Sequence, residues 1–300
     1  MELRVLRYFL AVAREESITA AAETLHVTQP TLSKQLMDLE TELGKKLFIR
    51  GRRKIILTEE GQFLRKRAQE LIDLADKTEA AFQEEGEIVS GDVYIGGGET
   101  EAIRYIAKTI RRLQESCPNI RFHLFSGNGE DVTERLDKGL LDFGLFVGAT
   151  ELRKYDYLVL PDADIWGLLM RKDHPLAAHS HIVPEDLKQT PLLFSRQMLI
   201  QNELSGWLGY PLDQLNIVGT YNLIYNASIM VEEGLGCALT IDRLINTSGN
   251  SRLCFRPLEP GISANLTVAW KKYQVFSKAA ARFLETLQQE IRVEETTKAE

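Results

Sequence analysis

The stretch SITAAAETLHVTQPTLSKQLMDLETELGKKLFIRGRRKIILTEEG, residues 17–61, decides the fold of the amino-terminal part of the chain. Ser17 can cap a first helix by accepting a backbone N–H. The alanines at 20–22 have high helix propensity and little bulk, so a second helix can cross closely. That second helix is expected from Gln29, with Thr28 as its N-cap and Pro30 in its first turn, where a missing N–H costs little. Two short helices around a tight turn are typical of a helix-turn-helix, which places its second helix in the major groove of DNA.

The second helix has one apolar face and one polar face. Leu32, Leu36, Leu39 and Leu43 follow at steps of four, three and four, which puts them on one side, against the first helix. The remaining side chains are short and hydrogen-bonding, or cationic, and such groups suit base edges and phosphates. The candidate DNA contacts on this helix are Thr28, Gln29, Pro30, Thr31, Ser33 and Lys34.

A basic segment follows. Residues 45–54 hold six Lys or Arg and no Asp or Glu, on what reads as two short strands, 47–50 and 54–57, turning at Gly51. A basic hairpin beside a recognition helix makes a winged helix, whose wing lies along the phosphate backbone or in the minor groove. It adds Arg50, Arg52 and Arg53 to the candidate DNA contacts. An ordinary helical hairpin with a solvated polar face would explain the leucines alone but not this order and spacing.

With these features in place, the amino-terminal part closely resembles the LysR-type transcriptional regulators. The matching positions are Phe9, the alanine cluster, Gln29-Pro30, Ser33, Leu39-Glu40, Leu43-Gly44, Leu47-Phe48-x-Arg50 and Leu57-Thr58-x-x-Gly61. Beyond about residue 60 the resemblance is one of layout, and it extends over the whole chain. It implies a sequence-specific regulator of transcription that binds double-stranded DNA and a small-molecule effector, is no enzyme, and forms a homodimer or homotetramer.

Length and charge agree with this interpretation. Three hundred residues suit about two to three domains. Residues 1–67 contain 13 Lys or Arg against 9 Asp or Glu, a net charge of +4, and because the whole chain carries −7, residues 68–300 carry −11. A basic head on an acidic body is expected to bind nucleic acid at one end only.

Residues 59–88 read as one long helix. Its apolar or small positions alternate steps of four and three: Leu64, Ala68, Leu71, Ala75, Thr78 and Phe82. A 3.5-residue period calls for a partner helix along the seam, and one recognition helix rarely gives enough specificity, so we expect dimerisation. The alternative is a helix packed on its own subunit. In the resembled family this segment is the linker helix that pairs two subunits.

From Val93 the chain alternates strands and helices, which predicts α/β architecture with a mostly parallel sheet. Strands are expected near 93–95, 121–125, 143–147, 157–160, 165–170, 192–194, 217–221, 237–240, 253–256 and 266–271, and helices near 101–116, 131–138 and 277–293. The resemblance implies two lobes of periplasmic-binding-protein type with a cleft between them. The predicted parts are therefore an all-α winged helix-turn-helix domain (1–58), a linker helix (59–89) and a two-lobed sensor domain (90–300), with lobe I at 90–161 and 266–300 and lobe II at 162–265.

A ligand is expected beyond the carboxyl ends of strands, near helix amino termini. Polar segments after three strands fit this position, although each could also be a plain surface loop. The candidate effector contacts are Gly98, Thr100, Ser126, Asn128, Ser195 and Arg196. Glu99 and Glu101 flank Thr100, a departure from the commonest pattern of a family that often binds small carboxylates. Two carboxylates oppose an anion, which leaves an amine, a zwitterion or a neutral molecule open.

Other chemistry receives less support. Cys117, Cys237 and Cys254 are widely spaced, so buried reduced thiols are expected rather than a disulfide, although a thiol redox sensor using the last two is a further alternative. A small-molecule binding protein or enzyme with a helical oligomerisation segment is another. The histidines at 174, 179 and 181 lie in a proline-framed loop, so neither a metal nor a cofactor is expected. Without a signal peptide or a long apolar run, we expect a cytoplasmic protein that does not bind membranes.

Overall fold

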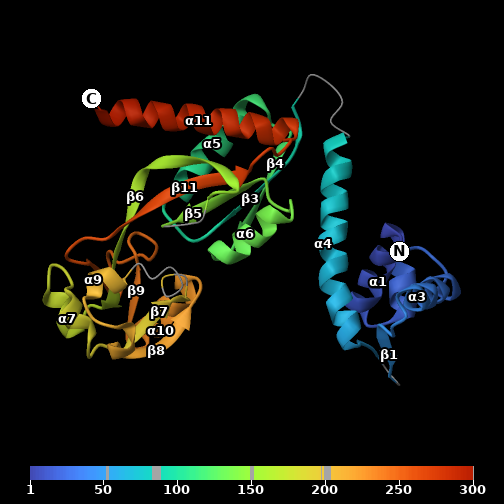
Figure 1. Ribbon diagram of the computed structural model, residues 1–300, viewed down its shortest axis with the longest axis horizontal. Helices are drawn as coiled ribbons and strands as arrows, with labels where there is room; N and C mark the ends of the chain where they lie inside the picture. Colours follow the sequence, from blue (N-terminus) through green and yellow to red (C-terminus); the bar gives the residue numbers. More distant parts are fainter. Residues whose placement is uncertain (52–53, 83–88, 149–151, 197, 199–203, 300) are drawn as a thin grey trace. The chain divides into compact units, whose positions relative to one another are not determined.

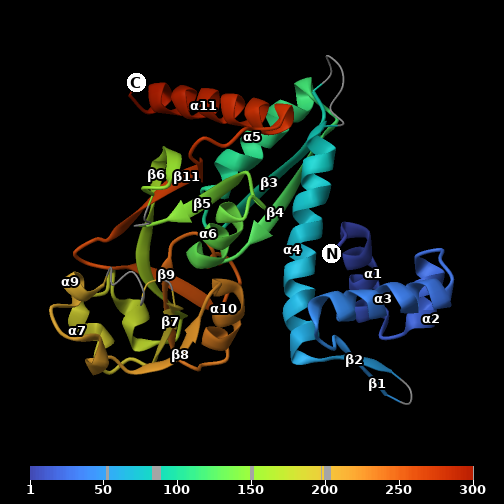
Figure 2. The ribbon, with the colours of Figure 1, turned by 45° about the vertical axis from the view of Figure 1, so that its right-hand side comes forward.

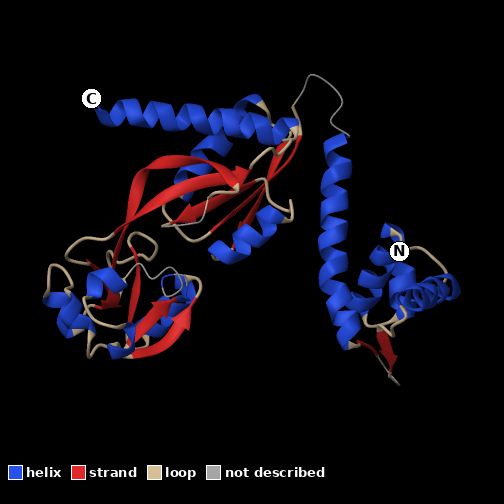
Figure 3. Cartoon of the chain, in the orientation of Figure 1, coloured by secondary structure: helices blue, strands red, loops and turns tan. Residues whose placement is uncertain are grey.

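The computed structural model describes residues 1–51, 54–82, 89–148, 152–196, 198 and 204–299. The chain divides into two compact units, Met1–Gln83 and Glu84–Glu300 (Figure 1). Figure 3 shows that the first unit is almost entirely helical, with one small hairpin, whereas the second combines strands and helices. None of the helices within the described ranges is long and apolar enough to cross a membrane.

The first unit begins with the expected helix-turn-helix. Its helices are α1 (Leu3–Glu15), α2 (Ile18–Thr24) and α3 (Gln29–Leu43). Ser17 caps α2 as predicted, because its hydroxyl accepts the N–H of Ala20 at 3.3 Å. Thr28 differs from the prediction: it occupies the N-cap position of α3, but its hydroxyl contacts that of Thr31 at 2.7 Å instead of a backbone N–H.

The apolar side of α3 lies in the core of this unit. Leu32, Leu36 and Leu39 are buried with Ala21 and Ala22, so the small alanines do allow the two helices to cross closely. Leu43 was predicted to belong to the same stripe, but it is 39% exposed. The helix ends directly after it, where Gly44 adopts a left-handed conformation that an L side chain rarely takes.

The predicted wing forms a two-stranded antiparallel hairpin, β1 (Phe48–Arg50) and β2 (Ile55–Leu57). At the turn end of the two strands, Gly51 N–H donates to Lys54 O at 2.9 Å. The motif Leu-Thr-x-x-Gly after β2 has a direct physical cause. Thr58 Oγ1 accepts the N–H of Gly61, and a side chain at Gly61 would lie 2.1 Å from the carbonyl oxygen of Leu47. The threonine therefore caps the next helix, and the glycine lets that helix approach the wing.

Helix α4 (Glu59–Phe82) agrees with the long helix predicted from residue 59, whereas the predicted residues 83–88 lie outside the described part of the chain. The seam that the sequence predicted along this helix has a different phase in the structure. Leu64 and Ala68, predicted to face a partner subunit, are buried with Ile72 against α1 of the same unit. Among the described side chains of α4, the large apolar ones that remain exposed are Phe63, Leu71, Leu74 and Phe82. The apolar pattern in the sequence therefore combines residues from two neighbouring faces of α4. One face is buried within the first unit, and the other is exposed.

In the second unit, lobe I is built on a mixed sheet. Its strands are β3 (Gly91–Gly97), β4 (Ile120–Ser126), β5 (Phe143–Val147), β11 (Ser263–Lys271) and the first half of β6 (Tyr155–Arg171). β3 pairs in parallel with β4 and β5, whereas β11 is antiparallel to β5 and β6. Helices α5 (Ile103–Ser116) and α11 (Lys278–Ala299) cover one face, and α6 (Gly129–Asp137) covers the other (Figures 1 and 2).

Strand β6 connects the lobes. The sequence predicted two strands, near 157–160 and 165–170, but one strand of 17 residues runs through both lobes. Its first half pairs with β11 and its second half with β9 and β10, all antiparallel. The expectation of a mostly parallel sheet is therefore wrong at the crossing, because a strand that passes directly between lobes needs no helical crossover.

Lobe II contains the second half of β6 with β7 (Leu192–Ser195), β8 (Ile217–Tyr221), β9 (Cys237–Ile241) and β10 (Leu253–Pro257). β7 pairs in parallel with β8 and β9. Its helices are α7 (Pro184–Leu187), α9 (Ser205–Leu208) and α10 (Ile224–Glu232), with short 3-10 turns at Pro175–Ala178 and Leu212–Gln214. Helix α10, which the sequence analysis did not predict, begins immediately after β8.

Candidate functional site

The amino end of α3 presents the predicted DNA-binding side chains on the surface of the first unit. Thr28, Gln29, Pro30, Thr31 and Lys34 are exposed, whereas Ser33 is half-buried beside the leucine face. These groups combine hydroxyl, amide and ammonium functions within seven consecutive residues, which is the chemistry needed to contact bases and phosphates together.

Glu40 attaches α3 to the wing. Its carboxylate accepts the N–H groups of Leu47 at 2.8 Å and Phe48 at 3.3 Å, and it pairs with Lys46 at 2.8 Å. Burial acts to raise the pKa of the Glu40 carboxyl, but these bonds outweigh it and hold the pKa below its ordinary value. The motif Leu39-Glu40 therefore has a structural role, fixing the recognition helix to the first strand of the hairpin.

The described lysines of the wing are exposed but paired within their own unit. Lys45 lies 3.5 Å from Glu60, and Lys54 pairs with Glu16. Exposed pairs of this kind contribute little stability, so phosphates can replace these carboxylates at small cost. Arg52 and Arg53 lie outside the described residues, and for Arg50 the structure describes the backbone in β1 only.

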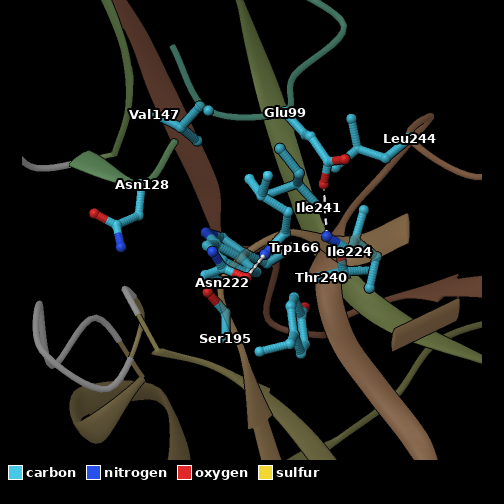
Figure 4. A pocket seen from close by; sticks show the side chains of 13 residues that line it. Glu99, Asn128, Val147, Trp166, Ser195, Asn222, Ile224, Thr240, Ile241 and Leu244 are labelled. Atoms are coloured by element: carbon cyan, nitrogen blue, oxygen red, sulfur yellow. Dashed lines mark hydrogen bonds between the residues drawn. The ribbon is translucent and has the colours of Figure 1, made fainter. Parts of the chain in front are cut away.

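A cavity of about 60 Å³ lies between the two lobes of the second unit. Its described lining comes from the carboxyl ends of strands in both lobes, from the middle of β6 and from the start of α10: Gly98, Glu99, Asn128, Val147, Trp166, Ser195, Tyr221, Asn222, Leu223, Ile224, Thr240, Ile241 and Leu244. Figure 4 shows these side chains around the cavity. The sequence predicts a ligand at this position, beyond the carboxyl ends of strands.

Three of the six predicted effector contacts line this cavity, namely Gly98, Asn128 and Ser195. Asn128 also caps α6, because its Oδ1 accepts the N–H of Asp131 at 2.9 Å. Ser126, at the end of β4, and Arg196, after β7, are exposed and do not belong to the described lining.

Thr100 has a different position from the one expected. It is buried beside the crossing strand, where its hydroxyl donates to Asp164 Oδ2 at 2.5 Å and accepts the N–H of Ala102 at 3.1 Å. Asp164 has no solvent exposure and also lies 3.3 Å from Arg243 Nη2 of lobe II. Burial raises the pKa of the Asp164 carboxyl, against the hydrogen bond from Thr100. Thr100 thus contributes to the contact between the lobes rather than to the cavity wall.

Ten of the thirteen lining residues were not predicted as ligand contacts, and Trp166 and Glu99 are two of them. Trp166 is 7% exposed, and its indole Nε1 has no hydrogen-bond partner in the described part of the chain. Glu99 Oε2 accepts the N–H of Ile224, the first residue of α10, at 2.5 Å. The sequence signal for Glu99 was its position beside Thr100. No signal pointed to Trp166, because indoles are common in cores.

The three cysteines are buried, with Cys237 on β9 and Cys254 on β10. β9 and β10 both pair with β6, so the two thiols are separated by a strand, or about 9.6 Å between backbones. This exceeds the reach of a disulfide. Burial raises the pKa of Cys237 to about 12 and also raises the pKa of Cys254, which disfavours the reactive thiolate.

The described residues also contain no metal-binding group of three or more His, Cys, Asp or Glu.

Comparison with known proteins gives matches over both parts of the chain. Residues 3–62 match the family model for bacterial regulatory helix-turn-helix proteins of the lysR family, and residues 87–292 match the LysR substrate binding domain. The Hca operon transcriptional activator HcaR of Escherichia coli (strain K12) is 32% identical over 91% of this chain and 92% of its own length. The hydrogen peroxide-inducible genes activator of Dickeya chrysanthemi is 30% identical over 64% of this chain and 63% of its own.

The fold has close counterparts among solved structures. The structure of full-length CbnR complexed with its target DNA has a TM-score of 0.71 and 18% identity, covering 97% of this chain and all of that one. A helix-turn-helix with a wing, followed by a two-lobed α/β domain, defines a ligand-responsive DNA-binding protein. The chain belongs to the LysR family of bacterial transcriptional regulators. It is a DNA-binding regulator with an effector-binding domain.

Proposed function

We propose that this regulator reads its operator with the exposed amino end of α3 and holds the DNA backbone with its wing. The supporting observation is the exposure of Gln29, Thr31 and Lys34 on one end of a helix that Glu40 fixes to the basic hairpin. Gln29 suits bidentate contact with adenine, whereas Lys34 suits guanine or phosphate. Arg50, Arg52 and Arg53 supply sequence-independent phosphate contacts.

Two copies pair through the open face of α4. The four large exposed apolar residues on this helix follow at steps of eight, three and eight, which places them on one side of it, and a large exposed apolar surface is unfavourable in water. Phe63, Leu71, Leu74 and Phe82 therefore constitute the dimerisation seam, in place of the seam starting at Leu64 that the sequence suggested. A dimer presents two recognition helices, which supports specific binding to a site with two halves.

The effector binds in the cavity between the lobes. Residues from both lobes line it, so a bound molecule can favour one arrangement of the lobes over another by its different affinity for the two. The protein needs no catalytic activity for this role, and Glu99, the carboxylate of the cavity, is engaged by a backbone N–H. Because its partner is chromosomal DNA, we place its action in the cytoplasm.

The decisive experiment is salt-dependent DNA binding by the full-length protein. Sequencing genomic fragments retained by the purified protein identifies the operator, and anisotropy titrations then give affinities over a range of salt. The affinity should fall linearly with salt on logarithmic axes, and Lys34→Ala should reduce the slope by about one if Lys34 contacts phosphate. Absence of salt-sensitive duplex binding would instead favour the enzyme or binding-protein alternative.

A separate test addresses the redox alternative. The geometry of Cys237 and Cys254 disfavours it, so Cys237→Ser and Cys254→Ser should leave operator binding unchanged under both reducing and oxidising conditions. A change in wild-type binding on treatment with peroxide, lost in either variant, would support a thiol sensor.

A further inference from the structure

The cavity between the lobes contains one carboxylate that is already engaged by a helix terminus. Glu99 follows β3 of lobe I, and its Oε2 accepts the N–H of Ile224 at the start of α10 in lobe II (Figure 4). The first four N–H groups of a helix have no partner within the helix, and they attract negative charge. Glu99 therefore occupies the position at α10 where the carboxylate of a ligand would otherwise bind.

No positive charge compensates Glu99 within the described lining. Glu99 is the one charged residue among those lining groups, and Arg196, the cation expected there, is exposed and outside them. The adjoining sequence 197–203 contains no Lys or Arg. A ligand carboxylate entering this cavity would meet a like charge in a partly desolvated site, which disfavours it.

A second group in the cavity requires a partner. The Nε1 of Trp166 is buried and donates to no acceptor in the described structure. Most buried donors in proteins are satisfied, and one that is not stands out as a site for an absent acceptor. Val147, Ile241 and Leu244 add apolar surface to the same lining. The cavity thus offers an acceptor at Glu99, a donor at Trp166 and apolar walls.

We propose, building on the function assigned to this cavity, that its effector is an uncharged molecule with an apolar body that carries a hydrogen-bond donor beside an acceptor, as a carboxamide does. The donor faces Glu99 and the acceptor faces Trp166 Nε1. Glu99 is the residue that excludes carboxylates. At about 60 Å³ the cavity is smaller than the roughly 300–1,000 Å³ of most ligand sites, so the cavity must widen to admit the effector.

Three probes of nearly equal shape test this inference: benzamide, benzoate and benzamidinium. Amide NMR of the full-length protein reports binding at two atoms, the indole N–H of Trp166 and the backbone N–H of Ile224. The chain has three tryptophans, so Trp166→Phe identifies the indole signal. Benzamide should shift both signals saturably, and its affinity should exceed that of benzoate at least about tenfold. Benzamidinium, which lacks the acceptor, should leave the Trp166 signal near its free position.

Two variants test whether Glu99 causes the preference for benzamide over benzoate. Glu99→Gln removes the charge and keeps an acceptor, so benzoate should gain about tenfold in affinity while benzamide changes little. Glu101→Gln is the matched control, because Glu101 pairs with Arg104 outside the described lining, and it should leave both affinities as in the wild type. Equal effects of the two variants would overturn the role of Glu99.

The possible failures are distinguishable. Preferred binding of benzoate by the wild type, or of benzamidinium over benzamide, would overturn the proposed ligand class and leave the cavity as the effector site. If none of the three probes shifts either signal, the assignment of this cavity as a small-molecule site fails with it.

Discussion

Glu40 joins the recognition helix to the wing through three contacts, and its side chain is only 10% exposed. Because its pKa is lowered in the folded protein, the ionised carboxylate contributes stability above its ordinary pKa of 4.5. That contribution is lost as the pH falls through the lower, folded value. The geometry of the DNA-binding surface therefore depends on one ionised side chain beneath it.

Replacing this carboxylate should weaken the first unit in a pH-dependent manner. We expect Glu40→Gln to lower the free energy of unfolding at neutral pH by about 1–2 kcal/mol, through loss of charge-assisted hydrogen bonds. The difference from the wild type should shrink below about pH 4. Urea titrations followed by methyl signals of the first unit measure it, with the exposed Glu23→Gln as control. A difference that does not vary with pH would contradict the role given to the charge.

Gln29 and Arg53 should separate base reading from backbone contact. Gln29→Ala should cost about 1–3 kcal/mol on the operator and little on random DNA, because it removes a contact to a base edge. Arg53→Ala should weaken binding to both sequences similarly. Competition titrations with operator and scrambled duplexes give the ratio. Equal losses on both duplexes for Gln29→Ala would remove it from the base-reading role.

At the scale of elements, α4 buries one face against its own unit and leaves another face exposed, which we propose as the subunit interface. Leu71 is 41% exposed, so Leu71→Glu should leave the domain folded but bury unpaired charges in the dimer. We expect the dimer to weaken more than a hundredfold, equivalent to about 3 kcal/mol, with weak DNA binding. Sedimentation measures the assembly.

Ile72→Glu is the contrasting variant for this helix. Ile72 is buried against α1, so a charge there should destabilise the first unit itself, by about 3 kcal/mol or more. A folded, fully dimeric Leu71→Glu protein would show that the open face of α4 is not the subunit interface.

Some helices and strands of this chain could be predicted from the sequence better than others. Helix α3 and the wing followed from local signals, since capping residues, alanines and cations act within a few residues. Local signals did not predict which side of α4 faces α1. Leu64 and Leu71 are seven residues apart and fit the same pattern, and only tertiary packing decides that Leu64 is the one buried against α1. The unbroken β6 was missed because polar Asp162 and Asp164 interrupt its pattern at the crossing.

The candidate site shows the same limit. Gly98, Asn128 and Ser195 line the cavity, and the sequence could place them there because they lie at or after strand ends, which converge in this fold. Thr100 follows a strand too, yet its hydroxyl points to Asp164, which lies 64 residues further along the chain. The sequence drew attention to Glu99 through its charge. Its contact with Ile224 could not be predicted, because it depends on α10, and the short sequence of this helix could not be distinguished from that of a loop.

At the scale of the whole molecule, Thr100 and Asp164 connect the lobes. Thr100→Val removes the donor from a buried carboxylate and should lower the stability of the second unit by about 1–3 kcal/mol. Thr100→Ser keeps the hydroxyl and should retain most of that stability. Thermal unfolding followed by tryptophan fluorescence reports this unit, since Trp166, Trp207 and Trp270 all belong to it. Equal stability of the two variants would show that the bond contributes nothing.

The effector should act on the spacing of the DNA-binding heads rather than on the contacts within one half-site. A ligand shifts the lobes only by its differential affinity for their arrangements, and the chain connects the lobes to α4 through residues 83–90. With a ligand obtained by thermal-shift screening, footprinting on the operator should show a change in protected length or bend. The contacts of Gln29 should remain, so the penalty of Gln29→Ala should be similar with and without ligand. A footprint unchanged in length while that penalty changes would mean that the effector acts on the recognition helix itself.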